Sequence, residues 1–594
     1  MSKKKLLSFF LVILLVISST VGCTKNKPVD EPGTGNVTNQ PEENSDLGKV
    51  EEEFKLFDEN GSPLNPPRDA IGKNGIVSSE RYEASKIGAE IIEKGGNAVD
   101  AAVATAFALG VCEPNASGLG GGGFMTLRIA ETGETVFIDF REVAPELATP
   151  DMYKVDEEGN VIDNLSWQGG LAVGVPGEVA GLLHILEKYG TMSREEVIRP
   201  AIELATNGYV VTPIALGNIN DAYETMMKFP ELGEIYLNDG LPPSVGDYIK
   251  NPDLAKTLQI IIDKGADGFY KGEVADAIVE SCKKYGGIIS HSDLENYKVI
   301  EREPVTGSYR GYEIISSPPP SSGGTHLLQI LNILENFDVG SMEPYSAEHM
   351  HLLSEAFKIA YADRAKYMGD PDYIEVPLNG LSNKDYAEKL AEKIDINKSQ
   401  TYEADDPWKY EGDSTTHLSV ADKDGNMVAI TKTLNYYFGS GVCVGGYGFI
   451  LNNQMDDFSP YPDEPNSVAP GKKPLSSMSP TMVLKDGKPF MVLGAPGGSS
   501  IFAIVAQTIS NVIDFDMDMQ EAISMPRIWD NLDNVITYQD GISEEEVNKL
   551  VEMGHEVYHM ANDTFGYIQG ALYKEDGTIH GGADPYCDSK AVGF

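Results

Sequence analysis

Thr415 is the first of two threonines that open a predicted strand in the stretch "GDSTTHLSV", residues 412–420. A threonine hydroxyl is a weak nucleophile unless a neighbouring amine takes its proton. A cut directly before Thr415 would place that amine on the same residue as the hydroxyl. Thr415 is therefore a candidate N-terminal nucleophile, although paired threonines in a strand are also explained by β-propensity alone.

The segments on either side of Thr415 predict how this residue is placed. Residues 395–414 are polar and aperiodic, which indicates an exposed connection. Alternating apolar residues then predict two antiparallel strands, 415–421 and 427–435, joined by a turn at 424–426. The candidate nucleophile thus begins a hairpin strand directly after an accessible point of the chain.

The first two thirds of the chain are predicted to be mainly helical. Residues 98–109, behind Asn97, are apolar nearly all round, so we expect a buried helix there. Residues 175–300 repeat at the helical period, and Ser193 with Glu196 forms a capping box. The last third alternates in short strands and turns, so the sequence mixes helices and sheets.

A glycine loop, "SGLGGGGFM", precedes a predicted hairpin of strands 124–129 and 135–140. Gly118, Gly120 and Gly123 formally match G-x-G-x-x-G, but a nucleotide-binding loop follows a strand and opens a helix. In this sequence the loop instead follows a predicted helix and precedes a predicted strand. We therefore interpret the glycines as a close approach of two backbone segments, and we expect no cofactor.

Charge and composition exclude some classes of function. The chain has 594 residues and a formal net charge of -45, from 46 Lys and Arg against 91 Asp and Glu. Such a chain repels phosphate backbones, so nucleic-acid binding is not expected. An acidic substrate would need a locally placed cation, which makes individual arginines informative.

The N-terminus predicts export. Residues 1–22 join a basic start to an apolar run, as a signal peptide does, and the small residues before Cys23 resemble a bacterial lipoprotein signal. Cys23 would then carry the lipid, and residues 23–50 would be a disordered tether. Simple secretion and a retained membrane helix are the alternatives.

Cysteine and histidine spacing suggests no metal site. Cys112, Cys282, Cys443 and Cys587 are far apart in sequence and are expected to be buried free thiols, although export would permit disulfides. The histidines at 326, 349 and 351 are expected to pack or hydrogen-bond, because residues two apart cannot share a helical face.

Several motifs together resemble the γ-glutamyltransferase (γ-glutamyltranspeptidase) family of N-terminal nucleophile hydrolases. They are "TTHLSVADKDGNMVAITKTLN", "LNNQMDDFS", "PLSSMSPTMV" and "GAPGGS" in the last third, with "GLGGGGFM", "DFRE", "PPPSSGGTH" and "AYADRAKYMGDP" before it. The resemblance covers the chain from about residue 70 to the end. It implies an α+β fold, a four-layer αββα sandwich.

The resemblance also implies autocatalytic cleavage between Ser414 and Thr415. A large subunit of residues 51–414 and a small subunit of residues 415–594 would remain together as a heterodimer. Thr415 would then attack γ-glutamyl amides, including glutathione, and pass the γ-glutamyl group to water or to an amino-acid or peptide amine. The expected partners are therefore a small-molecule donor and acceptor.

The family pattern assigns roles to the matching positions. Arg141 would hold the substrate α-carboxylate, with a pair to Asp139 or Glu142 as its alternative reading. Thr433 would orient the nucleophile, and Gly497 and Gly498 would form the oxyanion hole. The other substrate-binding residues are two hydroxyls at the carboxylate and three acceptors for the α-ammonium, namely Ser476, Ser477, Asn435, Gln454 and Asp457.

One departure keeps two alternatives open. Only sixteen residues separate Asp457 from Pro474, which is shorter than in relatives with a lid over the pocket. An open pocket would admit long chains, so a poly-γ-glutamate (capsule) depolymerase is a rival within the family. A non-catalytic lipoprotein that binds γ-glutamyl peptides is the rival outside enzyme function.

Overall fold

The computed structural model describes residues 66–402, 414–532 and 534–594. All of them belong to one compact unit. The predicted signal peptide, Cys23 and the tether lie outside the described residues.

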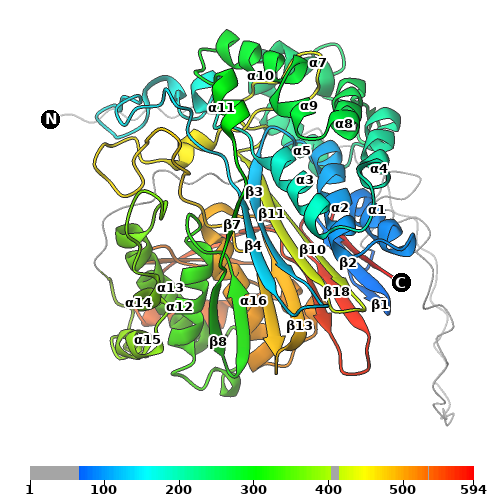
Figure 1. Ribbon diagram of the computed structural model, residues 1–594. Coiled ribbons are helices and arrows are strands. Elements are labelled where there is room, and N and C mark those ends of the chain that lie inside the picture. The colour runs from blue at the N-terminus through cyan, green and yellow to red at the C-terminus, as the bar shows by residue number, and fades with distance from the viewer. Residues whose placement is uncertain (1–65, 403–413, 533) are drawn as a thin grey trace, which may run out of the picture. The chain divides into compact units, whose positions relative to one another are not determined.

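Two seven-stranded antiparallel sheets form the centre of the fold (Figure 1). The first sheet has the order β19-β2-β10-β11-β3-β4-β7, with bounds Lys590–Gly593, Gly75–Ser79, Ser414–Asp422, Met427–Asn435, Gly122–Arg128, Thr135–Phe140 and Ile300–Arg302. The second sheet has the order β1-β18-β17-β13-β12-β9-β8, with bounds Ala70–Gly72, Ile579–Ala583, Gln569–Tyr573, Lys488–Gly494, Thr481–Lys485, Tyr312–Ser316 and Val305–Tyr309.

The two sheets stack on each other through small and medium apolar side chains. Ile76 and Ala429 of the first sheet belong to the same buried cluster as Met482, Val492 and Ala571 of the second. Each sheet also carries helices on its outer face, so its strands are buried on both sides.

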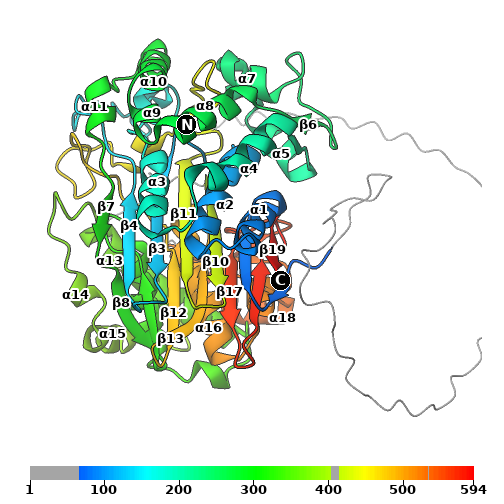
Figure 2. The ribbon, with the colours of Figure 1, turned by 45° about the vertical axis from the view of Figure 1, so that its right-hand side comes forward.

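The first helical layer covers the first sheet through the largest apolar cluster. Figure 2 shows α1, α2 and α3 beside the strands of this sheet. The helices of this half are α1 (Tyr82–Glu93), α2 (Ala98–Cys112), α3 (Glu178–Tyr189), α4 (Arg194–Asn207), α5 (Pro213–Asp221), α6 (Tyr223–Lys228), α7 (Pro230–Tyr236), α8 (Pro252–Lys264), α9 (Asp267–Tyr270), α10 (Glu273–Lys284) and α11 (His291–Asn296).

The second helical layer covers the second sheet, where α12 packs on β8 and β9 and α16 packs on β13. Its helices are α12 (Gly323–Leu334), α13 (Ala347–Tyr367), α14 (Leu378–Leu381), α15 (Lys384–Ala391), α16 (Ile501–Asp514), α17 (Met519–Ser524) and α18 (Glu544–Glu552). Two small sheets complete the fold, β14 (Ile528–Trp529) with β15 (Val535–Gln539) and β16 (Glu556–Met560), and β5 (Tyr209–Val210) with β6 (Tyr248–Ile249). The predicted αββα sandwich is confirmed.

The last third was expected to hold short strands and turns, but it also contains the helices α16, α17 and α18, so that prediction was incomplete. Other local predictions agree with the structure. The buried helix is α2, where the Asn97 side chain accepts hydrogen bonds from the backbone N–H groups of Val99 and Asp100. The Ser193 and Glu196 capping box begins α4. Both predicted hairpins are present as β3–β4 and β10–β11. The four described cysteines are buried and free, as expected.

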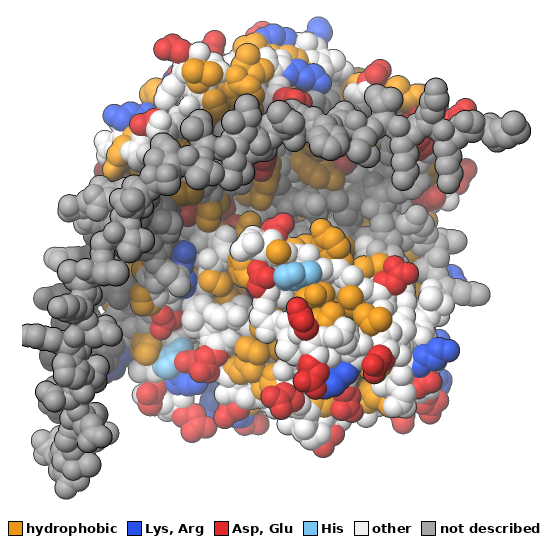
Figure 3. Space-filling model, turned by 180° about the vertical axis from the view of Figure 1, so that it is seen from behind, with side chains coloured by type: hydrophobic (Ala, Val, Ile, Leu, Met, Phe, Trp, Pro, Cys, Tyr) orange, Lys and Arg blue, Asp and Glu red, His pale blue; other side chains and the backbone are white. Residues whose placement is uncertain are grey.

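The surface of the described part is acidic. Figure 3 shows one face, on which Asp and Glu side chains outnumber those of Lys and Arg. Among the described helices, none is both long enough and apolar enough to cross a membrane.

Candidate active site

Thr415 lies at an irregularity in the pairing of β10 with β11. Ser414 pairs with Asn435 and Thr416 pairs with Lys432, so the register shifts by one residue across Thr415. Such a bulge bends a strand and redirects the side chain at that point. The Thr415 hydroxyl donates a hydrogen bond to Thr433 Oγ1 at 3.3 Å.

Thr433 is held by its own surroundings. Its hydroxyl accepts a hydrogen bond of 2.7 Å from the backbone N–H of Asn435. The glycine loop lies directly against it, since a Cβ on Gly121 would come within 2.2 Å of the Thr433 carbonyl oxygen. The glycines thus permit a close backbone approach, as predicted, and they fix the strand that orients the candidate nucleophile.

A small cavity of about 20 Å³ opens on one side of Thr415, and we call it the donor cavity. It brings together every predicted catalytic and substrate-binding residue except Gly497. These residues are Thr415, Thr433, Gly498, Arg141, Asn435, Gln454, Asp457, Ser476 and Ser477. They come from five separate stretches of sequence, so the tertiary fold assembles the predicted site.

Arg141 and Asp457 form the charged centre of the donor cavity. The Arg141 guanidinium is buried and donates a hydrogen bond to Asp457 Oδ2, which also accepts one of 2.5 Å from Gln454 Nε2. The alternative partner Asp139 is instead bound by Arg302 and Lys473, at 2.8 and 2.7 Å. The cation and the carboxylate predicted to hold an α-amino acid are therefore adjacent.

Glu142 is the second carboxyl near Arg141, 3.8 Å from Nη1. Neither of its oxygens has a hydrogen-bond partner among the described residues. Burial raises the pKa of Glu142 to about 8, although the Arg141 charge opposes this shift. At neutral pH Glu142 is therefore mostly protonated and does not act as a carboxylate partner of Arg141.

Gly497 and Gly498 lie where β13 leads into α16. Their φ angles are +135° and +56°, in the region that favours glycine, and a Cβ on Gly497 would come within 2.1 Å of the Phe565 carbonyl oxygen. Gly498 begins the helical turn that continues into α16, where backbone N–H groups are free of intrahelical partners. This is the geometry that suits an oxyanion site.

A much larger cavity of about 560 Å³ lies on the other side of Thr415, and we call it the chamber. Thr415 and Gly497 line its inner end. Aromatic and acidic side chains make up much of its wall, among them Trp167, Tyr436, Tyr437, Trp529, Tyr567, Glu80, Glu113 and Asp588. The chamber was not predicted from the sequence, because no single motif contains it.

Comparison with known proteins assigns the chain. The profile described as Gamma-glutamyltranspeptidase matches residues 84–594. The chain belongs to the γ-glutamyltranspeptidase family. It is 45% identical over 531 residues to the glutathione hydrolase proenzyme of Escherichia coli (strain K12), covering 86% of this chain and 90% of that protein.

Two further relatives show the breadth of this similarity. The chain is 40% identical over 521 residues to the acylase ACY 1 proenzyme of Pseudomonas sp. (strain SE83), covering 87% of this chain and 93% of that protein. The crystal structure of cephalosporin acylase from Bacillus halodurans superposes with a TM-score of 0.82 at 28% identity, covering 91% of this chain and 99% of that chain.

Arg364 is a site residue of this γ-glutamyltranspeptidase that sequence reasoning missed. It lies on α13 and donates hydrogen bonds to Ser477 Oγ at 3.0 Å and to Ser322 Oγ at 2.7 Å. Burial lowers the pKa of Arg364 to about 10, so it stays charged at neutral pH. The available signal was its place in the quoted motif "AYADRAKYMGDP".

Thr416 and His417, which follow the nucleophile, point away from the donor cavity. The Thr416 hydroxyl donates to Glu113 at 2.6 Å, and the His417 ring bonds to Thr431 and Ser419. Burial lowers the pKa of His417 to about 3, so its ring stays neutral. Both side chains therefore help to hold β10 in place.

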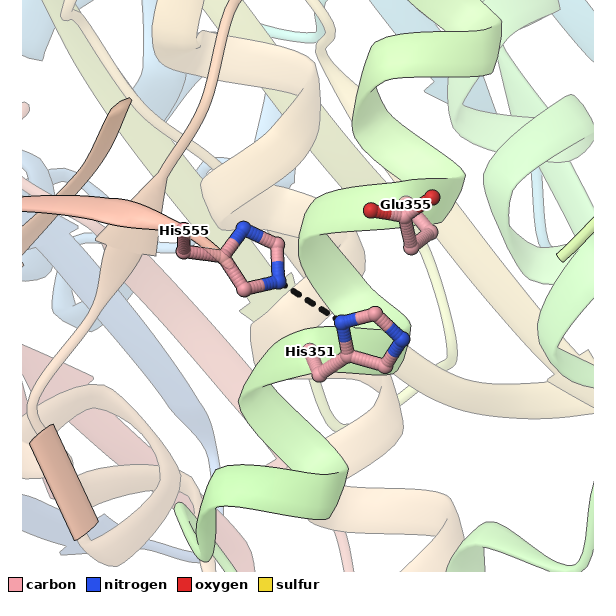
Figure 4. A group of neighbouring side chains, drawn as sticks. All are labelled: His351, Glu355 and His555. Carbon is pink, nitrogen blue, oxygen red and sulfur yellow. Dashed lines mark hydrogen bonds between the residues drawn. The ribbon is translucent and has the colours of Figure 1, made fainter. Parts of the chain in front are cut away.

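His351, Glu355 and His555 form the one cluster of potential metal ligands found in the described part of this family member (Figure 4). His351 Nδ1 and His555 Nε2 are hydrogen-bonded at 2.7 Å. Glu355 is already paired with Lys358 at 2.6 Å and accepts a hydrogen bond of 2.8 Å from Tyr402. The adjacent ammonium opposes a bound cation, so we interpret the cluster as a polar core.

Proposed function

We propose that this chain is a γ-glutamyltranspeptidase and glutathione hydrolase that matures by cutting itself between Ser414 and Thr415. One observation carries the proposal. Thr415, Arg141 and Asp457 meet in a single cavity, so a nucleophile lies beside the two charges that an α-amino acid requires.

Maturation uses the same hydroxyl as catalysis. Thr415 Oγ1 attacks the Ser414 carbonyl carbon, and the acyl group moves from the Thr415 nitrogen to its oxygen. Water then hydrolyses the resulting ester, which restores the hydroxyl and frees the α-amine. The products are a large subunit that ends at Ser414 and a small subunit of residues 415–594.

In the first half of turnover, Thr415 Oγ1 attacks the γ-carbonyl of the donor. The hydroxyl proton passes to the Thr415 α-amine, and the negative oxygen of the tetrahedral intermediate accepts hydrogen bonds at Gly497 and Gly498. The C–N bond then breaks, and the proton leaves with the amine. Water or a second amine cleaves the γ-glutamyl ester in the other half, so hydrolysis and transfer share one intermediate.

Donor selection follows from charge. The α-carboxylate of the donor would pair with the Arg141 guanidinium, while its α-ammonium would pair with Asp457, near Gln454 and Asn435. Each buried charge then keeps an opposite partner, which a ligand with only one of the two groups cannot provide. Ser476 and Ser477, the latter held by Arg364, complete the carboxylate end.

The test is release of a chromogenic amine from a γ-glutamyl anilide, with and without glycylglycine as acceptor. We expect wild-type protein to release the amine, and glycylglycine to increase the rate. Thr415→Ala should lower the rate by at least about a thousandfold and should remain one full-length chain on a denaturing gel. Thr132→Ala, in an exposed turn, is the matched control. Full activity of Thr415→Ala would refute the proposal.

Substrate length and location are also proposals. Residues 458–473 line neither the donor cavity nor the chamber, which supports a pocket without a lid and keeps poly-γ-glutamate as an alternative donor.

We further propose export by residues 1–22 and anchoring through a lipid on Cys23. Metabolic labelling with a tagged fatty acid tests the anchor, which Cys23→Ser should abolish. A single full-length, inactive chain in wild-type protein would favour the binding-protein alternative.

A further inference from the structure

The inner end of the chamber contains two adjacent buried carboxyl groups, Glu80 and Glu113. Glu80 follows β2, and its Oε1 accepts a hydrogen bond of 2.9 Å from the backbone N–H of His417. Glu113 follows α2, and its Oε2 accepts one of 2.6 Å from Thr416 Oγ1. Both carboxyls are therefore anchored to the two residues after the nucleophile.

These two carboxyls interact directly. Burial raises the pKa of Glu80 well above its ordinary value, and the neighbouring Glu113 raises it further. Burial also raises the pKa of Glu113. Two neighbouring carboxyls disfavour each other's ionisation, which favours a proton shared between them.

The described lining of the chamber contains little positive charge beside this pair of carboxyls. Arg81 is the one Lys or Arg among its described lining residues. Its guanidinium is already paired with Glu83 at 3.0 Å and with Asp588 at 3.3 Å. The acidic lining therefore has the sign that attracts a cation and repels an anion.

The walls of the chamber add a second feature that favours cations. Trp167 and Tyr436 pack edge to face at 5.6 Å between ring centroids, and Tyr437, Trp529 and Tyr567 also line the space. Aromatic faces attract ammonium and guanidinium groups, most strongly where water is partly excluded. Carboxylates combined with aromatic rings are the usual chemistry of a cation site.

We propose that the chamber is a cation-selective subsite for the leaving and accepting amines, with Glu80 and Glu113 as its anionic end. Because Thr415 lines both cavities, a γ-glutamyl group in the donor cavity directs its amide substituent into the chamber. The preferred amines carry a second ammonium or a guanidinium, as basic amino acids, basic peptides and polyamines do. This inference rests on the proposed γ-glutamyl transfer.

The test compares two γ-glutamyl anilides of equal shape. One bears a trimethylammoniomethyl group at the para position, and the other bears a neopentyl group, which replaces the charged nitrogen with carbon. The methylene weakens the electronic effect of the charge on the leaving aniline, and comparison with the variants, in which this effect is unchanged, isolates binding. We expect wild-type protein to have about a tenfold lower KM for the cationic anilide.

Variants then locate the preference. The double variant Glu80→Gln/Glu113→Gln keeps an oxygen for the His417 N–H and the Thr416 hydroxyl and removes both carboxyls, so it should reduce the KM ratio at least about threefold. Glu131→Gln, in an exposed turn, is the matched control and should keep the wild-type ratio. If the double variant fails to mature, Trp167→Leu tests the proposal instead. It removes an aromatic ring from the chamber wall and should also reduce the KM ratio of the two anilides.

The outcomes separate the two proposals. If neither anilide releases its amine, the proposed function itself fails. If both are cleaved with equal KM in wild-type protein, the chamber is not cation-selective. If the preference exists but survives in the double glutamine variant, Glu80 and Glu113 are not its source.

Discussion

The two cavities that meet at Thr415 are built in different ways. The donor cavity is small, and its charges are fixed by short contacts, with Arg141 bound to Asp457 and Arg364 bound to Ser477. The chamber is far larger and is lined by rings and by carboxyls. One nucleophile can therefore demand a single acyl group and still accept many different amines.

This contrast separates the expected effects of substitutions. Changes in the donor cavity should weaken turnover of every γ-glutamyl substrate by a similar factor. Changes in the chamber should alter how kcat/KM varies with the amine, while the requirement for a γ-glutamyl group is preserved. A variant of the donor cavity that changed only the preference among amines would contradict this contrast between the two cavities.

The largest effect is expected for Arg141→Lys. Lysine keeps the charge but loses the two-pronged contact with a carboxylate, so kcat/KM should fall about a hundredfold with every amide tested. Steady-state kinetics on two anilides of different size measures this. Arg310→Lys, a change to an arginine paired with Asp514, should leave kcat/KM within about twofold.

Arg364→Lys should have the next largest effect. The substitution keeps a cation but removes the fork that holds Ser322 and Ser477, so KM for donors should rise about tenfold. As a control for folding and maturation, the variant should show the same two subunits on a denaturing gel as the wild type. A rise limited to bulky amines would instead place Arg364 on the chamber side.

A pH effect of a few fold is expected from Glu142, whose raised pKa lies at about 8. Below that pH the carboxyl is mostly neutral. Above it the carboxylate offsets the charge of Arg141 and repels the donor carboxylate, so KM should rise about threefold to tenfold between pH 7 and pH 9. Glu142→Gln should remove this component, while titration of the donor amine affects both proteins alike.

The smallest effect is expected at the chamber rim. Trp167 is 38% exposed, so Trp167→Leu should raise KM about threefold for an anilide, through loss of ring contact. The same variant should change KM for a γ-glutamyl methylamide by less than about twofold. Equal changes with both amides would show that the ring acts on the donor side.

Much of the fold was accessible from the sequence because local patterns and tertiary packing agree. The β10–β11 hairpin alternates over a turn with Gly425, and α2 carries its capping box. The residues of the donor cavity were predicted through the family resemblance of the short motifs that contain them. Thr415 alone, however, was indistinguishable from an ordinary strand threonine without those motifs.

The features that were missed depend on packing between distant segments. Arg364 serves the site only because α13 brings it against the loop of Ser477. Glu80 and Glu113 are separated by a helix pair, and neither stretch shows a catalytic pattern. Their proximity arises because β2 and the end of α2 meet beside the same strand, β10.

The central claim is that Thr415 becomes the first residue of the small subunit and then carries the γ-glutamyl group. Mass spectrometry of the mature protein, quenched during turnover, tests both parts at once. We predict a small subunit that begins at Thr415, with a γ-glutamyl ester on its N-terminal peptide. An active protein whose Ser414–Thr415 bond is intact, or an ester on another residue, would contradict the account.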